Sequence, residues 1–400
     1  MSARGLDQAQ GAPDPLPCAP SPVSAIAEAG EGAVLDHLAR SARDLVRGVA
    51  DGGPHAAEGA AMRPVASNLT PSGAAVEAAF VWGGVGPDGR PGCDPRISLD
   101  PLPGGAPSAR LAAALALLRA AGTARLSVQQ QMLAAEVAEW QASSPGRYGA
   151  WAGLRAGSVA ASPAGASPPL AAKLYLELPE RAREAACALE QRLAGAPPVL
   201  GGRDIRPTML GLDPQNGGVE VYYRCDRLFP GDLDTLMRRF RLAERSGEVV
   251  ALIERLTRRS VRFELPSWDV GFSVAYVAGE EGARLSPAVF TFYSNAASLL
   301  GPDERVRCAL MREGRAANWD MVPYAALHAR MPETVPGEAP LQCHGLVGAV
   351  LPSVGDMRVT ATLALPRALG CPARRDAMRA QPGSLPQAHA AEGREEHGHA

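Results

Sequence analysis

The stretch RPTMLGLDPQNGGVEVYYRCD (residues 206–226) predicts a β-hairpin. Its two halves are 206–214 and 219–226, and in the second half polar residues alternate with Val219, Val221 and Tyr223, which is the pattern of a strand with two different faces. The connection Gln215-Asn216-Gly217-Gly218 contains the Asn-Gly pair that is a strong signal for a tight hairpin turn. Because hairpin strands run antiparallel, this stretch is expected to supply two neighbouring strands of an antiparallel sheet.

The same arrangement of two short strands followed by helical sequence recurs along the chain. The five expected strand pairs are 76–82 with 96–102, 148–157 with 171–179, 206–214 with 219–226, 271–279 with 288–295, and 345–352 with 358–366. Helices are expected at 108–122, 127–141, 180–195, 230–247 and 248–260. The segment 83–95 is rich in Gly and Pro and is expected to be a long turn.

Ten antiparallel strands with helices on one face can close on themselves. We therefore predict an α+β fold: a ten-stranded antiparallel β-barrel with a solvent-filled lumen, surrounded by helices and built from five β-β-helix units. An open sheet with a wet polar face is the alternative. Residues 25–375 are expected to form this single domain, and 1–24 and 376–400 are expected to be disordered tails.

The alternation of side chains along the strands favours the barrel. Lys173, Tyr175 and Glu177 share one face of their strand, and the leucines between them share the other. Basic residues and tyrosines recur on the polar faces of other strands, where they are Arg96, Tyr222, Arg224, Tyr293 and Arg358. If the apolar faces lie against the helices, these polar side chains point into a common lumen.

Composition excludes several classes of function. The chain has 400 residues, is 46% hydrophobic and carries a formal net charge of -2, so it can bury a core but lacks the basic surplus of a sequence-independent nucleic-acid binder. It contains no apolar run long enough for a membrane span, and its first residues do not read as a secretory signal. The 7 cysteines are scattered and form no CxxC motif. We expect a cytoplasmic protein without nucleic-acid or membrane partners, and the oligomeric state is left open.

Lysine usage is unusual. Of the 40 basic residues only Lys173 is a lysine, so arginine stands wherever either cation would serve. A retained ammonium is a compact point charge that the planar guanidinium does not replace, which favours a specific role for Lys173. The alternative is the chance survival of one surface lysine.

Three segments resemble a known family. SNLTPSGAAVEAAFVW (67–82) is similar to the opening of the aromatic prenyltransferases of the tryptophan dimethylallyltransferase type, 173–176 resembles their Lys-x-Tyr strand, and 96–102 resembles their arginine-containing second strand. The resemblance extends over roughly residues 30–370 and implies the ABBA or PT barrel. It implies an enzyme of secondary metabolism, such as alkaloid biosynthesis. Such an enzyme transfers a dimethylallyl or related prenyl group from an allylic diphosphate to an indole-like acceptor by Friedel–Crafts alkylation.

The diphosphate leaving group needs positive charge where its own charge grows. No two aspartates are adjacent in this chain, so a metal-binding DDxxD cluster is absent from the sequence and the cations are expected to be side chains. No cofactor and no requirement for Mg²⁺ are expected. Arg96 and Lys173 match diphosphate-contacting positions of the family. Arg224 and Arg358 share the polar faces of later strands and are added, with a surface salt bridge as their alternative.

The resemblance also assigns roles to aromatic and acidic residues. Tyr175 matches the family's tyrosine shield, and Tyr222 and Tyr293 are candidates for the same wall, which would keep water from the allyl cation and stabilise its charge. The alternative for each is a half-buried strand tyrosine. Glu77 matches the glutamate that accepts a hydrogen bond from the indole N–H, and with Lys173 it is the predicted catalytic residue. The alternative for Glu77 is a solvated carboxylate.

The chain also departs from the family's pattern. Glu220 stands where a cation is expected, Thr291 replaces a polar amide or basic residue, and Ala361 with its neighbouring threonines occupies a stretch where a tyrosine is common. These departures leave two other hypotheses open. One is a non-catalytic barrel that binds an aromatic or apolar ligand. The other is a prenyltransferase with a phenolic or peptide acceptor, whose hydroxyl Glu77 would orient.

Overall fold

A computed structural model describes the central part of the chain, residues 76–364. The exceptions within it are 86–90, 103–104, 124, 145, 157–169, 196–197, 226, 241, 243–244, 268, 279–284 and 330–341. The two predicted tails lie outside the described residues, as does the part of the family-like segment that precedes Val76. No helix in the described part combines the length and the apolar character needed to cross a bilayer.

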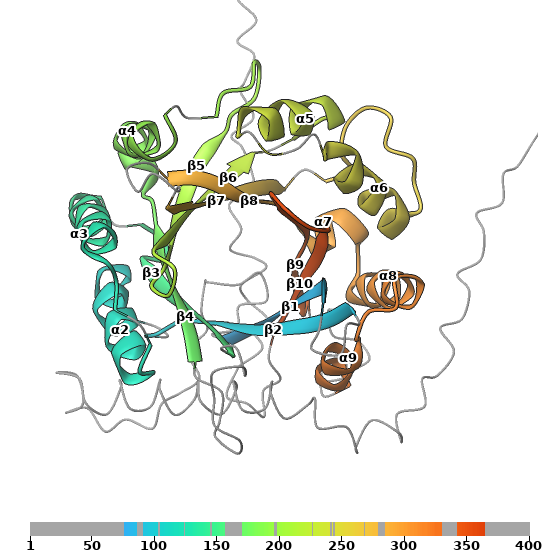
Figure 1. Cartoon of the computed structure of the whole chain (residues 1–400), viewed down its shortest axis with the longest axis horizontal. Helices are drawn as coiled ribbons and strands as arrows, with labels where there is room; N and C mark the ends of the chain where they lie inside the picture. Colours follow the sequence, from blue (N-terminus) through green and yellow to red (C-terminus); the bar gives the residue numbers. More distant parts are fainter. Residues whose placement is uncertain are drawn as a thin grey trace, which may run out of the picture.

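The described strands form a closed antiparallel barrel in the order β1-β10-β9-β8-β7-β6-β5-β4-β3-β2 (Figure 1). They are β1 Val76–Val85, β2 Pro91–Leu99, β3 Ala150–Ala156, β4 Leu170–Glu177, β5 Arg206–Asp213, β6 Gly218–Cys225, β7 Val270–Ala278, β8 Leu285–Asn295, β9 His344–Pro352 and β10 Arg358–Ala364. Each strand pairs with its neighbours in sequence, and β1 closes the ring by pairing with β10. The predicted fold class is confirmed.

The helices lie around the outside of the barrel (Figure 1). They are α2 Pro107–Ala120, α3 Val128–Ser143, the short η3 Glu180–Ala182, α4 Arg183–Ala194, α5 Pro230–Arg239, α6 Ser246–Thr257, α7 Ala296–Leu300, α8 Asp303–Ala316 and α9 Val322–His328. They connect each even-numbered strand up to β8 with the next odd-numbered strand. The hairpins therefore gather at one end of the barrel and the helical connections at the other.

Local sequence signals set the helix ends and attach a helix to the barrel. Ser127 and Gln130 form a capping box at the start of α3, with hydrogen bonds of 3.2 Å and 3.0 Å between side chain and backbone. The Gln130 amide then donates to the backbone carbonyls of Asp213 and Gly218, at 2.8 Å and 2.9 Å. One side chain thus begins α3 and holds the β5–β6 hairpin. Gly195, at a φ of 82°, ends α4 in the left-handed conformation that glycine adopts readily.

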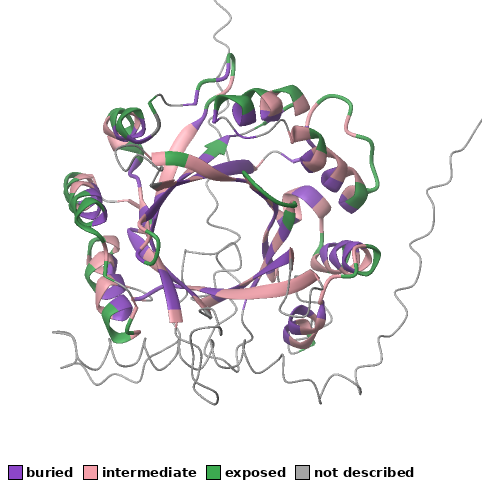
Figure 2. Cartoon of the chain, viewed as in Figure 1, coloured by how far each residue is buried: buried purple, intermediate pink, exposed green. Residues whose placement is uncertain are grey.

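The core lies between the barrel and its helices. On β4, Leu174 and Leu176 are fully buried on the outward face, and the polar residues between them face the lumen. Figure 2 shows the barrel strands mostly as buried or half-buried, with the exposed residues mainly on the surrounding helices and their connections. Outside β6, β7 and β8, Tyr223, Phe272 and Phe290 stack with ring centres 4.6 Å and 5.6 Å apart. The predicted division of the strand faces is confirmed.

Two predicted segments differ in the structure. The long turn expected at 83–95 is wrong, because β1 continues to Val85 and β2 begins at Pro91. Gly83, at a φ of 97°, accompanies a shift of register between Trp82 and Gly84, after which the ladder resumes. The helix expected at 230–247 ends early, at Arg239, as α5, and α6, which corresponds to the helix expected at 248–260, begins at Ser246. Between them Phe240 and Leu242 are buried in the core.

A carboxyl group is buried in the layer between α4 and the barrel. Glu190 is only 1% exposed. Burial raises its pKa to about 7, by more than the nearby Tyr223 and Arg239 side chains lower it. The folded protein therefore takes up a proton at Glu190 at pH values where the unfolded chain would have released it.

This burial predicts a pH-dependent stability. Because the pKa of Glu190 rises from 4.5 to about 7 on folding, its contribution to the free energy of unfolding is largest below pH 4.5 and is lost as the pH rises through about 7. Glu190→Gln, which is neutral throughout, should be more stable than the wild type by about 1–3 kcal/mol at pH 8 and should differ little at pH 4. Urea unfolding at both pH values measures this difference. Parallel stability curves for the two proteins would contradict it.

Candidate active site

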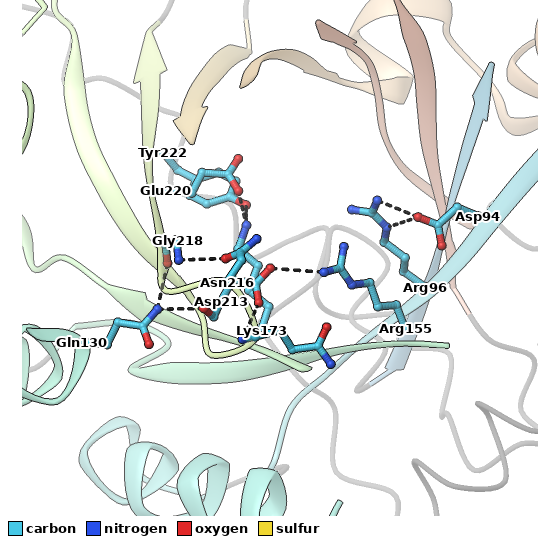
Figure 3. A network of polar contacts seen from close by, with 11 residues as sticks. Asp94, Arg96, Gln130, Arg155, Lys173, Asp213, Asn216, Gly218, Glu220 and Tyr222 are labelled. Atoms are coloured by element: carbon cyan, nitrogen blue, oxygen red, sulfur yellow. Dashed lines mark hydrogen bonds and ion pairs between the residues drawn. The ribbon is translucent and has the colours of Figure 1, made fainter. Parts of the chain in front are cut away.

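The single lysine lies in the lumen and crosses to a neighbouring strand. The Lys173 ammonium on β4 donates to the carboxylate of Glu220 on β6 and lies 3.3 Å from the Tyr222 hydroxyl (Figure 3). It lies 5.5 Å and 5.6 Å from the ring centres of Tyr175 and Tyr222, at cation–π distance. Its side chain is 24% exposed. The structure therefore excludes the surface alternative for this lysine.

Both members of the pair are charged near neutral pH. Burial alone would lower the pKa of Lys173, but the Glu220 carboxylate more than offsets it, so the pKa is raised. Burial would raise the pKa of Glu220, but the Lys173 charge and hydrogen bonds from Lys173, Ser273 and Tyr222 bring it below its usual value. Glu220, which departs from the pattern of the family, thus neutralises the charge of Lys173.

Arg96 lies close to this pair. Its Nε and Nη2 donate to one oxygen of Asp94 on the same strand, at 3.0 Å and 2.7 Å. Burial would lower the pKa of Arg96, but Asp94, and then the fields of Tyr175 and Glu220, raise it. Arg96, Lys173 and Tyr175 are therefore brought together on one part of the lumen wall, as the alternation of side chains predicts.

Aromatic rings continue this wall across four strands. Trp151 stacks on Tyr175 at 5.7 Å between centres, Tyr175 meets Tyr222 at 6.0 Å, and Tyr222 meets Tyr293 at 6.4 Å. The Tyr293 hydroxyl donates to the backbone carbonyl of Tyr223 at 2.9 Å. All three predicted tyrosines belong to this wall. Trp151 was not predicted, although it alternates with buried Ala150 and Ala152 and so belongs to the lumen face of β3.

Glycines make room for these large side chains. Gly153, Gly211 and Gly271 lie on β3, β5 and β7, between the strands that carry the large residues. A Cβ at Gly153 would lie 2.9 Å from the Tyr175 ring, and one at Gly211 would lie 2.7 Å from Cε of Lys173. The Tyr175 ring and the Lys173 stem thus lie over positions without side chains, which is a reason for glycine inside a strand.

Glu77 faces the lumen from β1, which pairs with the β2 strand that carries Arg96. Around the ring of ten strands, β1 lies five strands from β6, which carries Glu220 and Tyr222. Glu77 is 6% exposed, burial raises its pKa to about 7, and a hydrogen bond with Thr362 offsets this only in part. Within the described part of the chain, its Oε1 has no hydrogen-bond partner and lies directly over Gly345. This oxygen is buried against the barrel wall, so it is an unsatisfied acceptor beside the lumen.

Two predicted cations lie apart from this cluster. Arg224, near the end of β6, pairs with Asp269, and its side chain is 55% exposed. Arg358 is exposed at the start of β10 and lies beside Gly84. The contacts of the described residues join neither to Lys173 or Arg96. The diphosphate-binding roles expected for Arg224 and Arg358 remain predictions, because no described contact places either residue beside Lys173 and Arg96.

Another cation was missed. Arg155 on β3 lies directly across from Arg96 in the ladder and binds Asp213 at 3.2 Å (Figure 3). The alternation of Trp151, Gly153 and Arg155 was the signal that could have located it. Of the two remaining departures, Thr291 is half-buried on β8, and Ala361 is buried on the outward face of β10. Ala361 therefore does not line the lumen, because Thr360 and Thr362 occupy that face.

Comparison with known proteins identifies the fold. No protein-family model matches the sequence, and no curated protein matches it. Among solved structures, 5-dimethylallyltryptophan synthase from Streptomyces coelicolor is similar, with 16% identity and a TM-score of 0.57 over 84% of this chain and 93% of that one. The chain has the fold of aromatic prenyltransferases. At this identity the likeness establishes the fold alone.

Two further structures agree. The 6-dimethylallyltryptophan synthase from Micromonospora olivasterospora, solved with DMASPP and Trp, has 18% identity and a TM-score of 0.58 over 84% of this chain and 95% of that one. The prenyltransferase PriB, solved with product diphosphate, has 16% identity and a TM-score of 0.57 over the same two shares. The aromatic-prenyltransferase fold thus accounts for most of the length of each protein.

The glycines predict a graded effect on stability. A Cβ at Gly271 would lie 2.5 Å from the Tyr223 carbonyl oxygen and closer still to the Tyr293 ring, and neither can move freely. Gly271→Ala should therefore lower the free energy of unfolding by about 1–3 kcal/mol. Gly211→Ala mainly displaces the flexible end of Lys173 and should cost less than Gly271→Ala. Urea denaturation of both variants tests this order, and equal losses would contradict it.

Proposed function

We propose that the protein is an aromatic prenyltransferase. It would transfer a dimethylallyl or related prenyl group from an allylic diphosphate to an indole-like acceptor by Friedel–Crafts alkylation. The observation that carries this proposal is the position of Lys173 and Arg96 beside an aromatic wall, inside a barrel with the prenyltransferase fold. An anion and an apolar cation can be stabilised there at the same time.

The basic residues would bind the leaving group. Negative charge grows on the diphosphate as the allylic C–O bond breaks, and fixed cations stabilise that charge without reorganising. Arg96 can present two N–H groups to phosphate oxygens, and Lys173 supplies a point charge. The rings of Tyr175 and Tyr222, between which the ammonium lies, would face the allyl cation, stabilise it through their π faces and exclude water.

Glu77 would orient and activate the acceptor. Its carboxylate would accept the indole N–H, which would make the ring a better nucleophile. The diphosphate leaves with the electron pair of the allylic C–O bond, the ring carbon then forms a bond with the allyl cation, and the ring loses a proton to recover its aromaticity. Glu77 is a base within the lumen with a pKa of about 7, which suits it to receive that proton.

A second function is supported by one feature. Because Glu220 neutralises Lys173, the lumen could instead bind an aromatic or apolar ligand without catalysis. A transferase with a phenolic or peptide acceptor is the further alternative, in which Glu77 would hold a hydroxyl. Neither alternative requires a metal ion, and in our proposal the cations are side chains.

The deciding experiment is an incubation of the purified protein with dimethylallyl diphosphate and tryptophan in the presence of EDTA. We expect diphosphate release together with a tryptophan product that carries one dimethylallyl group, detected by mass spectrometry. The variant Arg96→Met should lose most of this activity. Absence of release with tryptophan, other indoles and phenols would support the binding protein, and activity only after Mg²⁺ addition would refute metal independence.

The pKa of Glu77 predicts the pH profile. Only the ionised carboxylate accepts both the indole hydrogen bond and the proton, so kcat/KM should rise as the pH increases through about 7 and then level off. Glu77→Gln should lower kcat/KM by about 100-fold or more and remove this rise. Steady-state rates between pH 5.5 and 9 provide the measurement. An unchanged inflection in the variant would assign the titration to another group.

A further inference from the structure

Four basic side chains on the polar faces of the strands each pair with a carboxylate in the described part of the chain. Lys173 pairs with Glu220, and three arginines that face the lumen pair with aspartates: Arg96 with Asp94, Arg155 with Asp213 and Arg224 with Asp269. Arg96 pairs within its own strand, whereas Arg155 reaches past β4 to Asp213 on β5, and Lys173 crosses Gly211 of β5 to reach Glu220 on β6. The negative charge of Glu220 therefore offsets the positive charge of the Lys173 ammonium, which a phosphate group would approach.

We propose that Glu220 is a specificity-determining residue of this anion site. Glu220 lowers the affinity of the lumen for a diphosphate. It also reduces the ratio of the affinity for a diphosphate to the affinity for a monophosphate. The inference rests on the proposed function, because it concerns the same site. Repulsion by one fixed carboxylate grows with the charge of the ligand, so a diphosphate is penalised more than a monophosphate.

The carboxylate is fixed in place. Glu220 is 9% exposed, and it accepts hydrogen bonds from the Ser273 hydroxyl as well as from Lys173. The Tyr222 hydroxyl also stabilises its charged form. A ligand therefore cannot simply displace Glu220 into solvent, and its charge is only weakly screened by salt at this depth.

Glu220 acts on more than one cation. Its field reaches Arg96 as well as Lys173, the two residues proposed to hold the diphosphate. A pair that served only to hold β4 against β6 would influence unfolding but not the choice between anions. Anion affinity is therefore the property that separates the two roles.

The test measures the binding of inorganic pyrophosphate and inorganic phosphate by isothermal titration calorimetry at pH 8, without metal. Glu220→Gln should bind pyrophosphate at least about tenfold more tightly than the wild type, which is about 1.4 kcal/mol, and should gain less for phosphate. Glu190→Gln removes a buried carboxylate that lies between α4 and the barrel, outside the lumen, so it should change pyrophosphate affinity less than about threefold. An equal gain in this control, or no gain in Glu220→Gln, would overturn the proposal.

A double variant avoids leaving a lone buried charge. Lys173→Met combined with Glu220→Gln removes the pair as a unit, and such replacements are usually tolerated by the fold. Because the pair is neutral, pyrophosphate affinity should stay within about threefold of the wild type. Pyrophosphate binding by the double variant that is as tight as that of Glu220→Gln alone would show that the gain does not come from the freed Lys173 ammonium, and it would overturn the proposal.

These outcomes are separate from the test of the proposed function. Prenyl transfer by the wild type, with no gain in pyrophosphate binding on Glu220→Gln, would overturn this inference alone. Tighter pyrophosphate binding by Glu220→Gln, with no transfer to any acceptor, would overturn the proposed enzyme and leave the role of Glu220 intact.

Discussion

The closure of β1 on β10 is the constraint on which the rest of the structure depends. Six residue pairs, from Glu77 opposite Ala364 to Trp82 opposite Val359, join the first and last strands. Without this ladder β1 would be an open edge, and the polar faces of the strands would meet bulk water. With it, the ordinary alternation of apolar and polar residues separates a dry layer under the helices from an enclosed lumen. Glu77 belongs to the closing strand, so the same pairing that completes the barrel also places its carboxylate inside.

Room inside the barrel is created by strands that lack side chains at chosen positions. Bulky residues stand on β4, β6 and β8, and glycines stand on β3, β5 and β7 between them. Tyr175 lies over Gly153, and Lys173 lies over Gly211. This arrangement makes the aromatic wall continuous, because each ring can lean across a neighbouring strand to reach the next. It also allows the Lys173 ammonium to span from β4 to β6, which a methyl group on β5 would obstruct.

Part of the fold and of the candidate site could be predicted from the sequence, and there is a physical reason why the rest could not. Side-chain alternation has a period of two and needs no knowledge of register, so the lumen face of Lys173, Tyr175 and Tyr222 could be identified in advance. Distances between strands depend on register and strand tilt, which the sequence does not state. Arg224 and Arg358 therefore have the expected face but lie away from the cluster. Helices α7, α8 and α9 were not predicted individually, and Trp151 lies on the strand whose pattern was weakest.

The requirements of folding and of anion binding differ at the Lys173–Glu220 pair. A ring of unpaired cations would hold a diphosphate firmly, but in the empty barrel their burial would cost free energy. Here Arg96 retains a partly exposed carboxylate partner, Asp94, while Lys173 has an almost buried one, Glu220. The first arrangement lets a ligand compete for a guanidinium that water already reaches. In our proposal, the second stabilises the barrel at the expense of anion affinity, because Glu220 would remain beside the phosphate of a bound ligand.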